Sequence, residues 1–222
     1  MGVVVAMDGP SGSGKSSTSR GVAVRLGLRY LDTGAMYRAI TWWMLAHGID
    51  VEDSAAVAAQ ADAPLLISGS DPLAPTISVD GVDVAGPIRE QAVTSAVSAV
   101  SAVPEIRRRL LREQRDIIGD GGIVVEGRDI GTVVAPDAPV KVYLTADPAS
   151  RAARRSAEQD GTDVAATQAD LIRRDTFDSG RATSPLAMAD DAHHIDTTPF
   201  TLDEVVDQVV ALVRAAQETA EP

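Results

Sequence analysis

The chain has 222 residues, of which 45% are hydrophobic and 23% are charged, so it is long enough to form an ordinary globular core. It carries 20 Lys and Arg residues against 32 Asp and Glu residues, and the net charge of −12 disfavours nucleic acid and anionic membranes as partners. The absence of cysteine excludes a disulfide framework, a thiolate metal site and a catalytic thiol.

The first half of the chain predicts a strand, a loop and a helix, followed by a small β-rich insert. The run Val3–Ala6 predicts a buried parallel strand, and residues 16–26 predict a helix. A short strand is expected at Tyr30-Leu31, and helices are expected over 35–47 and 51–61. Between 64 and 87, three β runs with Asp80-Gly81 as a hairpin signal predict a small antiparallel sheet.

The second half alternates predicted helices and strands. Helices are expected over 88–103, 104–118, 148–159, 164 to about 174, and 202–216. Strands are expected over 123–125, 140–144 and 194–196. This order predicts an α/β fold with a central parallel sheet that has helices on both faces.

A phosphate-binding loop follows the first predicted strand. The residues that match the pattern G-x-x-x-x-G-K-[ST] are Gly9, Pro10, Ser11, Gly12, Ser13, Gly14, Lys15 and Ser16. Glycines let successive backbone N–H groups turn toward one anion, and the following helix adds its own free N–H groups. Lys15 then suits the β- and γ-phosphates and the Ser16 hydroxyl suits Mg²⁺. The pattern predicts binding of a nucleoside triphosphate.

The class of phosphate-loop protein can be narrowed from the rest of the chain. The guanine-reading motif N-K-x-D of GTPases needs Asn, which this sequence lacks, and motors or transporters are usually longer. A small kinase fits, because phosphoryl transfer between two anions depends on arginines for charge stabilisation. Arg151, Arg154 and Arg155 share one helix face, where they need an anion or carboxylates to offset them. A second set of arginines is predicted to lie on a solvent-exposed helix face, paired with Glu105 and Glu113. These arginines are Arg108, Arg109, Arg112 and Arg115.

Five segments in order resemble the bacterial cytidylate kinases, enzymes that phosphorylate CMP and dCMP with ATP. They are DGPSGSGKSS at 8–17, LDTGAMYRA at 31–39, the insert at 64–87, EGRDIGTVVAPDAPVKVYLTA at 126–146 and RRDTFDSGRATSPL at 173–186. The resemblance covers nearly the whole chain. It implies one P-loop kinase domain over 1–222, with a core (about 1–50, 104–147 and 187–222), a nucleotide-acceptor insert (about 51–103) and a lid (about 148–186).

The resemblance also implies roles for individual residues. Gly9 to Ser17 would hold the ATP phosphates, with Lys15 at the transferred phosphoryl group and Ser16 near Mg²⁺. The residues that would hold CMP are Thr33, Arg38, Ser98, Arg107, Arg128, Asp129, Arg174, Asp178 and Arg181. Among them Ser98, Arg107 and Asp129 would surround cytosine, and Asp178 would face the ribose. The lid would supply Arg151, Arg154 and Arg155 to the transition state, beside the catalytic Lys15 and Arg128.

The sequence alone leaves several residue roles and two other functions open. Thr33 also suits the cap of the following helix, Ser95 and Ser101 compete with Ser98, and the role of Glu126 is undefined. His193-His194 reads as a strand start instead of a metal pair. A kinase for shikimate, gluconate or another nucleoside monophosphate is one alternative, and a nucleotide-dependent switch or ATPase is another. We expect ATP and CMP or dCMP as the substrates of a cytoplasmic monomer, with no nucleic acid or membrane partner.

Overall fold

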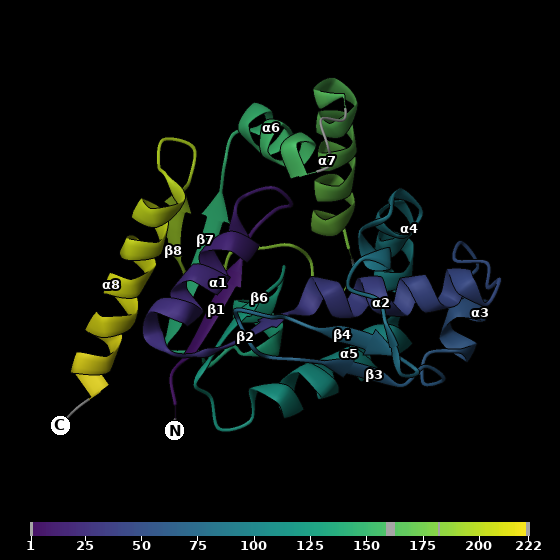
Figure 1. Cartoon of the computed structure of the whole chain (residues 1–222), viewed down its shortest axis with the longest axis horizontal. Helices are drawn as coiled ribbons and strands as arrows, with labels where there is room; N and C mark the ends of the chain where they lie inside the picture. Colours follow the sequence, from purple (N-terminus) through teal and green to yellow (C-terminus); the bar gives the residue numbers. More distant parts are fainter. Residues whose placement is uncertain (1, 159–162, 182, 221–222) are drawn as a thin grey trace. The chain divides into compact units, whose positions relative to one another are not determined.

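The computed structural model describes residues 2–158, 163–181 and 183–220. It divides into two compact units, one of Met1–Tyr30 and Asp120–Pro222, the other of Leu31–Gly119. We call them unit 1 and unit 2. Figure 1 labels most of their helices and strands. The predicted insert at about 51–103 lies within unit 2, and the described part of the predicted lid at about 148–186 lies within unit 1, while 159–162 and 182 lie outside the described residues.

A five-stranded sheet forms the centre of unit 1, and its strand order is β2-β6-β1-β7-β8. Its strands are β1 (Val4–Asp8), β2 (Arg29–Asp32), β6 (Ile123–Glu126), β7 (Val140–Thr145) and β8 (His193–Asp196). β1 pairs in parallel with β6 and with β7, and β7 pairs in parallel with β8. β2 spans the boundary between the two units. Together with the flanking helices, this sheet confirms the predicted α/β class.

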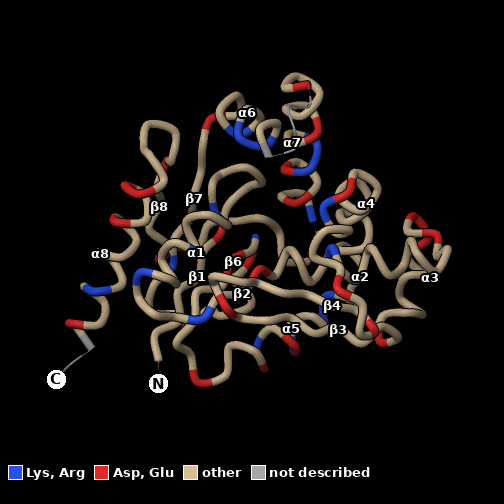
Figure 2. Tube along the Cα trace, viewed as in Figure 1, with Lys and Arg blue, Asp and Glu red and all other residues tan. Residues whose placement is uncertain are grey.

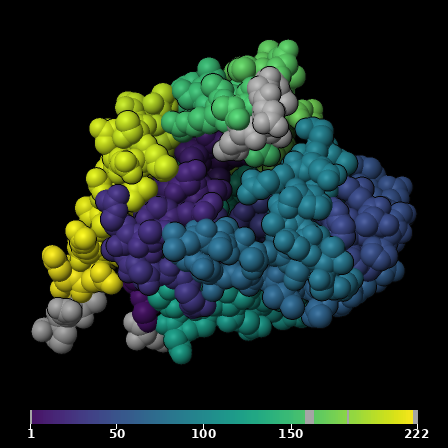
Figure 3. Space-filling model, viewed as in Figure 1, coloured from purple at the N-terminus to yellow at the C-terminus, as the bar shows by residue number. Residues whose placement is uncertain are grey.

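Helices α1 (Lys15–Leu26) and α8 (Leu202–Ala220) cover one face of this sheet. Their core residues are each less than 10% exposed and pack on Val5 and Met7 of β1; they are Val22, Ala23, Val205, Val206, Val209, Val210 and Val213. Gly21 allows the close approach, because a Cβ there would lie 2.7 Å from a methyl carbon of Val206. In Figure 3 the atoms of α8 lie directly against those of α1.

The remaining helices of unit 1 are α6 (Pro148–Glu158), α7 (Val164–Ser179) and a π-helical turn, η2 (Ile130–Val134). Unit 2 contains α2 (Thr33–Ala46), α3 (Ser54–Ala59), α4 (Gln91–Ala102), α5 (Pro104–Ile118) and a 3₁₀ turn, η1 (Pro87–Arg89). Within the described residues, every helix is too short or too polar to span a lipid bilayer.

The three-stranded antiparallel insert is present in unit 2, with strand order β3-β4-β5. It consists of β3 (Leu66–Ser68), β4 (Ile77–Val79) and β5 (Val82–Asp83). Asp80 and Gly81 form the hairpin turn with φ angles of 51° and 79°, the left-handed pair that a type I′ turn requires. The Trp43 indole N–H donates to Asp80 Oδ2 at 2.7 Å, which ties the turn to α2. The hairpin prediction is confirmed.

Four predicted helix boundaries were wrong by three residues or more, among them the end of α8, which lies at Ala220 and not at Ala216. α3 begins at Ser54 and not near Val51, because the Asp53 carboxylate caps it by accepting from the N–H groups of Ala55 and Ala56. The predicted helix from Ile88 is split, because Glu90 has extended backbone (φ −60°, ψ 149°) between η1 and α4. α7 continues past Arg174 to Ser179, and carboxylates of its last turns form ion pairs with Arg151 and Arg128.

The arginines of α5 are not all solvated, which corrects another expectation. Arg108 is exposed and pairs with Glu105 as predicted. Arg109 pairs with Glu113 but is only 7% exposed, and its guanidinium donates to the carbonyl oxygens of Ala61 at 2.6 Å and Pro64 at 2.5 Å. Arg109 therefore stabilises the segment that leads into β3, a role that helix periodicity does not reveal.

Candidate active site

The phosphate loop connects β1 to α1 in unit 1. Gly9, Gly12 and Gly14 have φ angles of 143°, 77° and 88°, which side chains disfavour. A Cβ at Gly9 would also lie 2.1 Å from the Leu144 carbonyl oxygen. The glycines of the motif are thus required by backbone conformation, and the loop ends at the N-terminus of α1, where free N–H groups favour an anion.

Lys15 lies over this loop. Its side chain is buried, and its ammonium group donates to the Pro10 carbonyl oxygen at 2.8 Å. Ser16 follows at the start of α1 and is exposed, with its hydroxyl donating to Glu126 Oε2 at 2.9 Å. The two side chains that the motif assigns to phosphate and metal therefore both lie in the first turn of α1, directly after the loop.

Glu126, whose role the sequence left undefined, is the carboxylate behind Ser16. It ends β6, is 3% exposed and accepts from the Tyr30 hydroxyl through Oε1. No function could be predicted for Tyr30 from local sequence, because 96 residues separate it from Glu126.

Asp8 is a second buried carboxylate that sequence reasoning did not single out. It ends β1 and accepts from the N–H groups of Ile130 at 2.8 Å and Gly131 at 2.7 Å, which fixes the segment after Arg128 and Asp129. Burial raises the pKa of Asp8 to about 6, although the two N–H groups and Lys15 oppose the shift. The neighbouring Asp129 adds to the rise in pKa.

Asp178 holds two of the predicted substrate arginines. It is 4% exposed, its Oδ2 accepts from Arg128 Nε at 3.1 Å, and its Oδ1 accepts from Arg181. Arg174, on the preceding turn of α7, is half-buried. One buried carboxylate therefore orients Arg128 and Arg181, which are 53 residues apart in the sequence.

Two of the three predicted lid arginines contact the phosphate loop or a residue that is bound to it. Arg151 donates to the Ser11 carbonyl oxygen at 3.1 Å and forms an ion pair with Asp175 of α7. Its backbone also packs on Gly12, where a Cβ would lie 3.0 Å from the Arg151 carbonyl oxygen. Figure 2 shows these basic positions of α6 and the mixed charges of α7.

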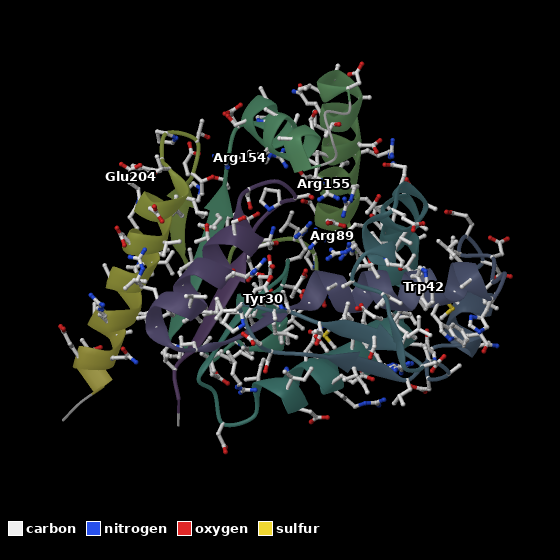
Figure 4. The ribbon with its side chains drawn as sticks, in the orientation of Figure 1. Tyr30, Trp42, Arg89, Arg154, Arg155 and Glu204 are labelled. Atoms are coloured by element: carbon white, nitrogen blue, oxygen red, sulfur yellow. The ribbon has the colours of Figure 1, made fainter. Side chains whose placement is uncertain are left out.

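Arg154 uses a different anchor. It donates to the Thr197 hydroxyl at 2.8 Å and to the Thr197 carbonyl oxygen at 3.0 Å, and the same hydroxyl donates to the Ser13 carbonyl oxygen at 3.1 Å. Arg155 lies beside it on α6 and is half-buried (Figure 4). Two of the three lid arginines therefore link α6 to the loop.

Unit 2 carries the other predicted substrate residues, and the helix cap there differs from one expectation. Asp32, and not Thr33, caps α2, because its carboxylate accepts from the Ala35 N–H at 2.8 Å. Arg38 donates to the other oxygen at 3.0 Å. Burial would raise the pKa of Asp32, but Arg38, the Ala35 N–H and Arg89 together hold it below its usual value. Thr33 is buried in the first turn of α2.

Arg107 is buried in α5, where its guanidinium lies 5.5 Å from the centre of the Tyr37 ring and donates to the Ser101 carbonyl oxygen at 3.2 Å. Ser98 lies half-buried on α4. Its two rivals are engaged within their own helix, since the Ser95 hydroxyl accepts from Gln91 and the Ser101 hydroxyl donates to the Ser98 carbonyl oxygen. This arrangement favours Ser98 over the other two serines.

The donor set suits a magnesium ion that arrives on a nucleotide. No group of three or more His, Asp or Glu residues able to hold a metal occurs in the described ranges. Mg²⁺ commonly takes one or two protein oxygens together with phosphate oxygens and water. The exposed Ser16 hydroxyl, held on a buried carboxylate at 2.9 Å, fits that pattern.

The pair His193 and His194 lies at the start of strand β8, as predicted. His194 Nε2 lies 2.8 Å from the Thr145 hydroxyl.

Comparison with known proteins decides the family. The family model for cytidylate kinase matches residues 5–215. The chain belongs to the cytidylate kinase family. The cytidylate kinase of Streptomyces griseus is 60% identical over 220 residues, covering 98% of this chain and 95% of that protein. The cytidylate kinase of Streptomyces coelicolor is 63% identical over 213 residues, covering 95% and 92%.

Membership of the cytidylate kinase family confirms the resemblance found in the sequence and makes the chain an ATP-dependent kinase of the nucleoside monophosphate class. Among solved structures, an uncharacterized protein from Eubacterium ventriosum superposes with a TM-score of 0.54 at 12% identity, over 97% of this chain and 99% of that one. This likeness concerns the fold alone.

Proposed function

We propose that the chain transfers the terminal phosphoryl group of Mg·ATP to CMP or dCMP, giving ADP and CDP or dCDP. The observation that carries the proposal is the phosphate loop with two arginines of α6 anchored on it, Arg151 on the Ser11 carbonyl and Arg154 through Thr197 on the Ser13 carbonyl. Phosphoryl transfer needs cations around both the donor and the acceptor phosphates, and this family supplies the acceptor class.

On the donor side, Gly9 to Ser17 would bind the ATP phosphates through their backbone N–H groups. Lys15 would exchange its hydrogen bond to the Pro10 carbonyl for one to the transferred phosphoryl group. An ammonium group binds a charged phosphate oxygen more strongly than it binds a neutral carbonyl oxygen. Mg²⁺, held at Ser16, would neutralise charge on the phosphates. Arg151, Arg154 and Arg155 would stabilise the charge that develops during transfer and exclude water, so that hydrolysis does not compete.

On the acceptor side, charge and hydrogen-bond chemistry support binding of cytidine monophosphate. The phosphate would bind cationic or hydroxyl side chains, namely Thr33, Arg38, Arg128, Arg174 and Arg181. Asp178 would accept from ribose hydroxyls. A carboxylate has about four lone-pair sites, so its bonds to the two arginines leave capacity for the sugar.

The base would be recognised by Asp129, Arg107 and Ser98. Cytosine offers an N4 amine as donor and N3 and O2 as acceptors, whereas uracil has an acceptor at position 4 and a donor at N3. A carboxylate at the amine and an arginine or a hydroxyl at the acceptors would favour cytosine. The Tyr37 ring beneath Arg107 supports this role, because it restricts the plane of the guanidinium.

The reaction needs no strong general base, because the acceptor phosphate is already ionised. We infer direct in-line transfer without a covalent enzyme intermediate. We also infer that the chain works as a monomer in the cytoplasm, where both nucleotides are available, without a nucleic acid or membrane partner. Sedimentation of the purified chain with and without ATP tests the monomer.

The test is ADP formation from Mg·ATP with CMP, dCMP, UMP, AMP and shikimate offered in parallel. The proposal expects turnover with CMP or dCMP, with UMP slower by roughly 100-fold in kcat/KM. Asp129→Ala should remove most of that discrimination while leaving ATP affinity within about twofold. Asp137→Ala, an exposed carboxylate eight residues on, is the matched control and should change neither.

Other outcomes would point elsewhere. Turnover with shikimate alone would indicate a different small-molecule kinase. ADP release that no monophosphate alters would indicate a nucleotide-dependent switch or ATPase, and the acceptor residues named above would then be withdrawn.

A further inference from the structure

Tyr30 combines two environments that a purely structural tyrosine does not need. Its side chain is 2% exposed and lies in the hydrophobic core of unit 1 with Val22 and Val124. Its hydroxyl nevertheless donates to Oε1 of Glu126, a carboxylate that is itself 3% exposed. A phenylalanine would fill the same core space, so packing alone does not explain the hydroxyl.

Glu126 links Tyr30 to the phosphate loop. Its other oxygen, Oε2, accepts from the Ser16 hydroxyl at 2.9 Å. Because the Ser16 proton is used in that bond, the lone pairs of the Ser16 oxygen are directed away from Glu126. A hydroxyl held in this way presents acceptor electrons to a cation, and Ser16 is exposed enough to receive one.

Tyr30 constrains the orientation of this carboxylate. The last side-chain torsion of glutamate is broad, so a carboxylate fixed through one oxygen can turn about it. A donor on each oxygen restricts that rotation. β2 is itself held in place at its start, because the Arg29 N–H donates to the Gly122 carbonyl at 2.9 Å and the Arg29 guanidinium donates to the Gly121 carbonyl at 2.8 Å.

We propose that Tyr30 is a positioning residue for metal–nucleotide binding: through Glu126 it orients the Ser16 hydroxyl so that its lone pairs face the Mg²⁺ of the bound nucleotide. The inference rests on the proposed function, since it takes Ser16 as the residue that meets the metal. Residues behind a metal ligand commonly change metal affinity by about 10- to 100-fold when they are altered.

The test measures ADP binding by calorimetry in the presence of Mg²⁺ and in the presence of EDTA, so that no turnover is involved. The ratio of the two affinities is the metal enhancement. Tyr30→Phe should lower this enhancement by about 10-fold and leave the affinity in EDTA within about twofold. Ser19→Ala is the control, because it deletes a buried hydroxyl of α1 that has no hydrogen-bond partner in the described part of the chain. It should leave both affinities unchanged.

A double-mutant cycle separates positioning from general destabilisation. In a Glu126→Gln background, Tyr30→Phe should change the enhancement by less than about twofold, because Tyr30 then has no carboxylate to orient. The inference is overturned by an unchanged enhancement in Tyr30→Phe, by an equal loss of affinity in EDTA, or by full additivity of the two changes. Thermal midpoints of all variants, measured in EDTA, show whether each one is folded.

Ser16→Ala distinguishes this inference from the proposed function. If Ser16→Ala loses the enhancement and Tyr30→Phe keeps it, only the positioning role of Tyr30 is refuted. If Ser16→Ala keeps the enhancement, the metal role of Ser16 fails, and the inference fails with it.

Discussion

Asp8 is a buried carboxylate whose two oxygens each accept one backbone N–H from η2. Both bonds need acceptors, so the ionised form suits the segment that follows Asp129. Burial opposes that form strongly enough to raise the pKa to about 6. The cost of desolvation, together with the repulsion from Asp129, thus exceeds the gain from two hydrogen bonds and from the nearby Lys15.

This raised pKa predicts a pH dependence of stability. The folded chain keeps a proton on Asp8 up to about pH 6, whereas the unfolded chain releases it near the ordinary value of 3.8. The contribution to the free energy of unfolding is therefore complete below pH 3.8 and is lost as the pH rises through about 6. A shift of this size corresponds to about 3 kcal/mol.

Denaturant unfolding of the parent and of Asp8→Asn at pH 4 and pH 7.5 measures the effect. The stability of the parent relative to Asp8→Asn should be about 2 kcal/mol higher at pH 4 than at pH 7.5, because pH 4 lies just above 3.8 and the full contribution is not yet reached. Asp137→Asn, at an exposed carboxylate, serves as the control. A difference between parent and Asp8→Asn that does not change with pH would contradict the assignment.

Arg109 is a buried cation that should contribute to the stability of unit 2. Its guanidinium satisfies two carbonyl oxygens and pairs with Glu113, with only 7% of the residue exposed. Arg109→Met should lower the free energy of unfolding by about 3 kcal/mol, because it leaves buried acceptors without donors. Arg112→Met is the matched control, since that side chain is 71% exposed and lies 3.9 Å from Asp62. It should cost less than about 1 kcal/mol, and equal losses in the two variants would refute the role of Arg109.

Helix α6 is joined to the phosphate loop through Thr197. The Thr197 hydroxyl accepts from Arg154 of α6 and donates to the Ser13 carbonyl of the loop, so it bridges the two elements. Thr197→Val keeps the volume and removes the bridge. A hydrogen bond to a charged group contributes about 1.5 kcal/mol or more, so the KM for ATP should rise about 10-fold.

Steady-state kinetics with each substrate varied in turn checks this prediction. The KM for CMP should change by less than about twofold, because the bridge joins α6 to the phosphate loop, which we propose binds ATP and not CMP. Thr198→Val is the control, since Thr198 is exposed and its hydroxyl contacts Asp196 and Asp147. Equal increases in both KM values would show that Thr197 acts on the fold as a whole.

Elements governed by local chemistry were predictable from the sequence. The phosphate loop depends on glycines at positive φ, and the hairpin depends on Asp80-Gly81, so both leave marks within a few residues. The boundary at Glu90 left no such mark, because no Gly, Pro or Asn separates η1 from α4.

Long-range partners explain what could not be predicted at the site. The sequence indicated Arg151 and Arg154 but not their contacts Asp175 and Thr197, which lie 24 and 43 residues away. Glu126 stood out only by its place after a strand. Its role became visible only in the structure, where it accepts from the Ser16 hydroxyl, 110 residues away in the sequence.

The two units of the molecule differ in how the chain forms them. Unit 2 is one continuous stretch, Leu31–Gly119, whereas unit 1 combines both ends of the chain. A unit of continuous chain closes with shorter loops, and such regions often open as separate cooperative units. We therefore expect hydrogen exchange to distinguish them.

Arg109→Met offers a way to measure this. Because its lost bonds all lie within unit 2, amide protection should fall in Leu31–Gly119 by about 100-fold and change far less in unit 1. Exchange detected by mass spectrometry of peptides from both units gives the comparison. A uniform loss of protection would instead mean that the whole chain opens in one step.

The chain has only two lysines, and the structure encloses both of them. Lys15 is 6% exposed over the phosphate loop, and Lys141 is 8% exposed with its ammonium group between the two oxygens of Asp191. An amine-acylating reagent added to the folded protein thus meets no exposed lysine side chain. Acylation of Lys141 would follow local opening around β7, whereas acylation of Lys15 would also be blocked by phosphates in the loop. One labelling reaction, resolved by site, therefore reports on fold and ligand together.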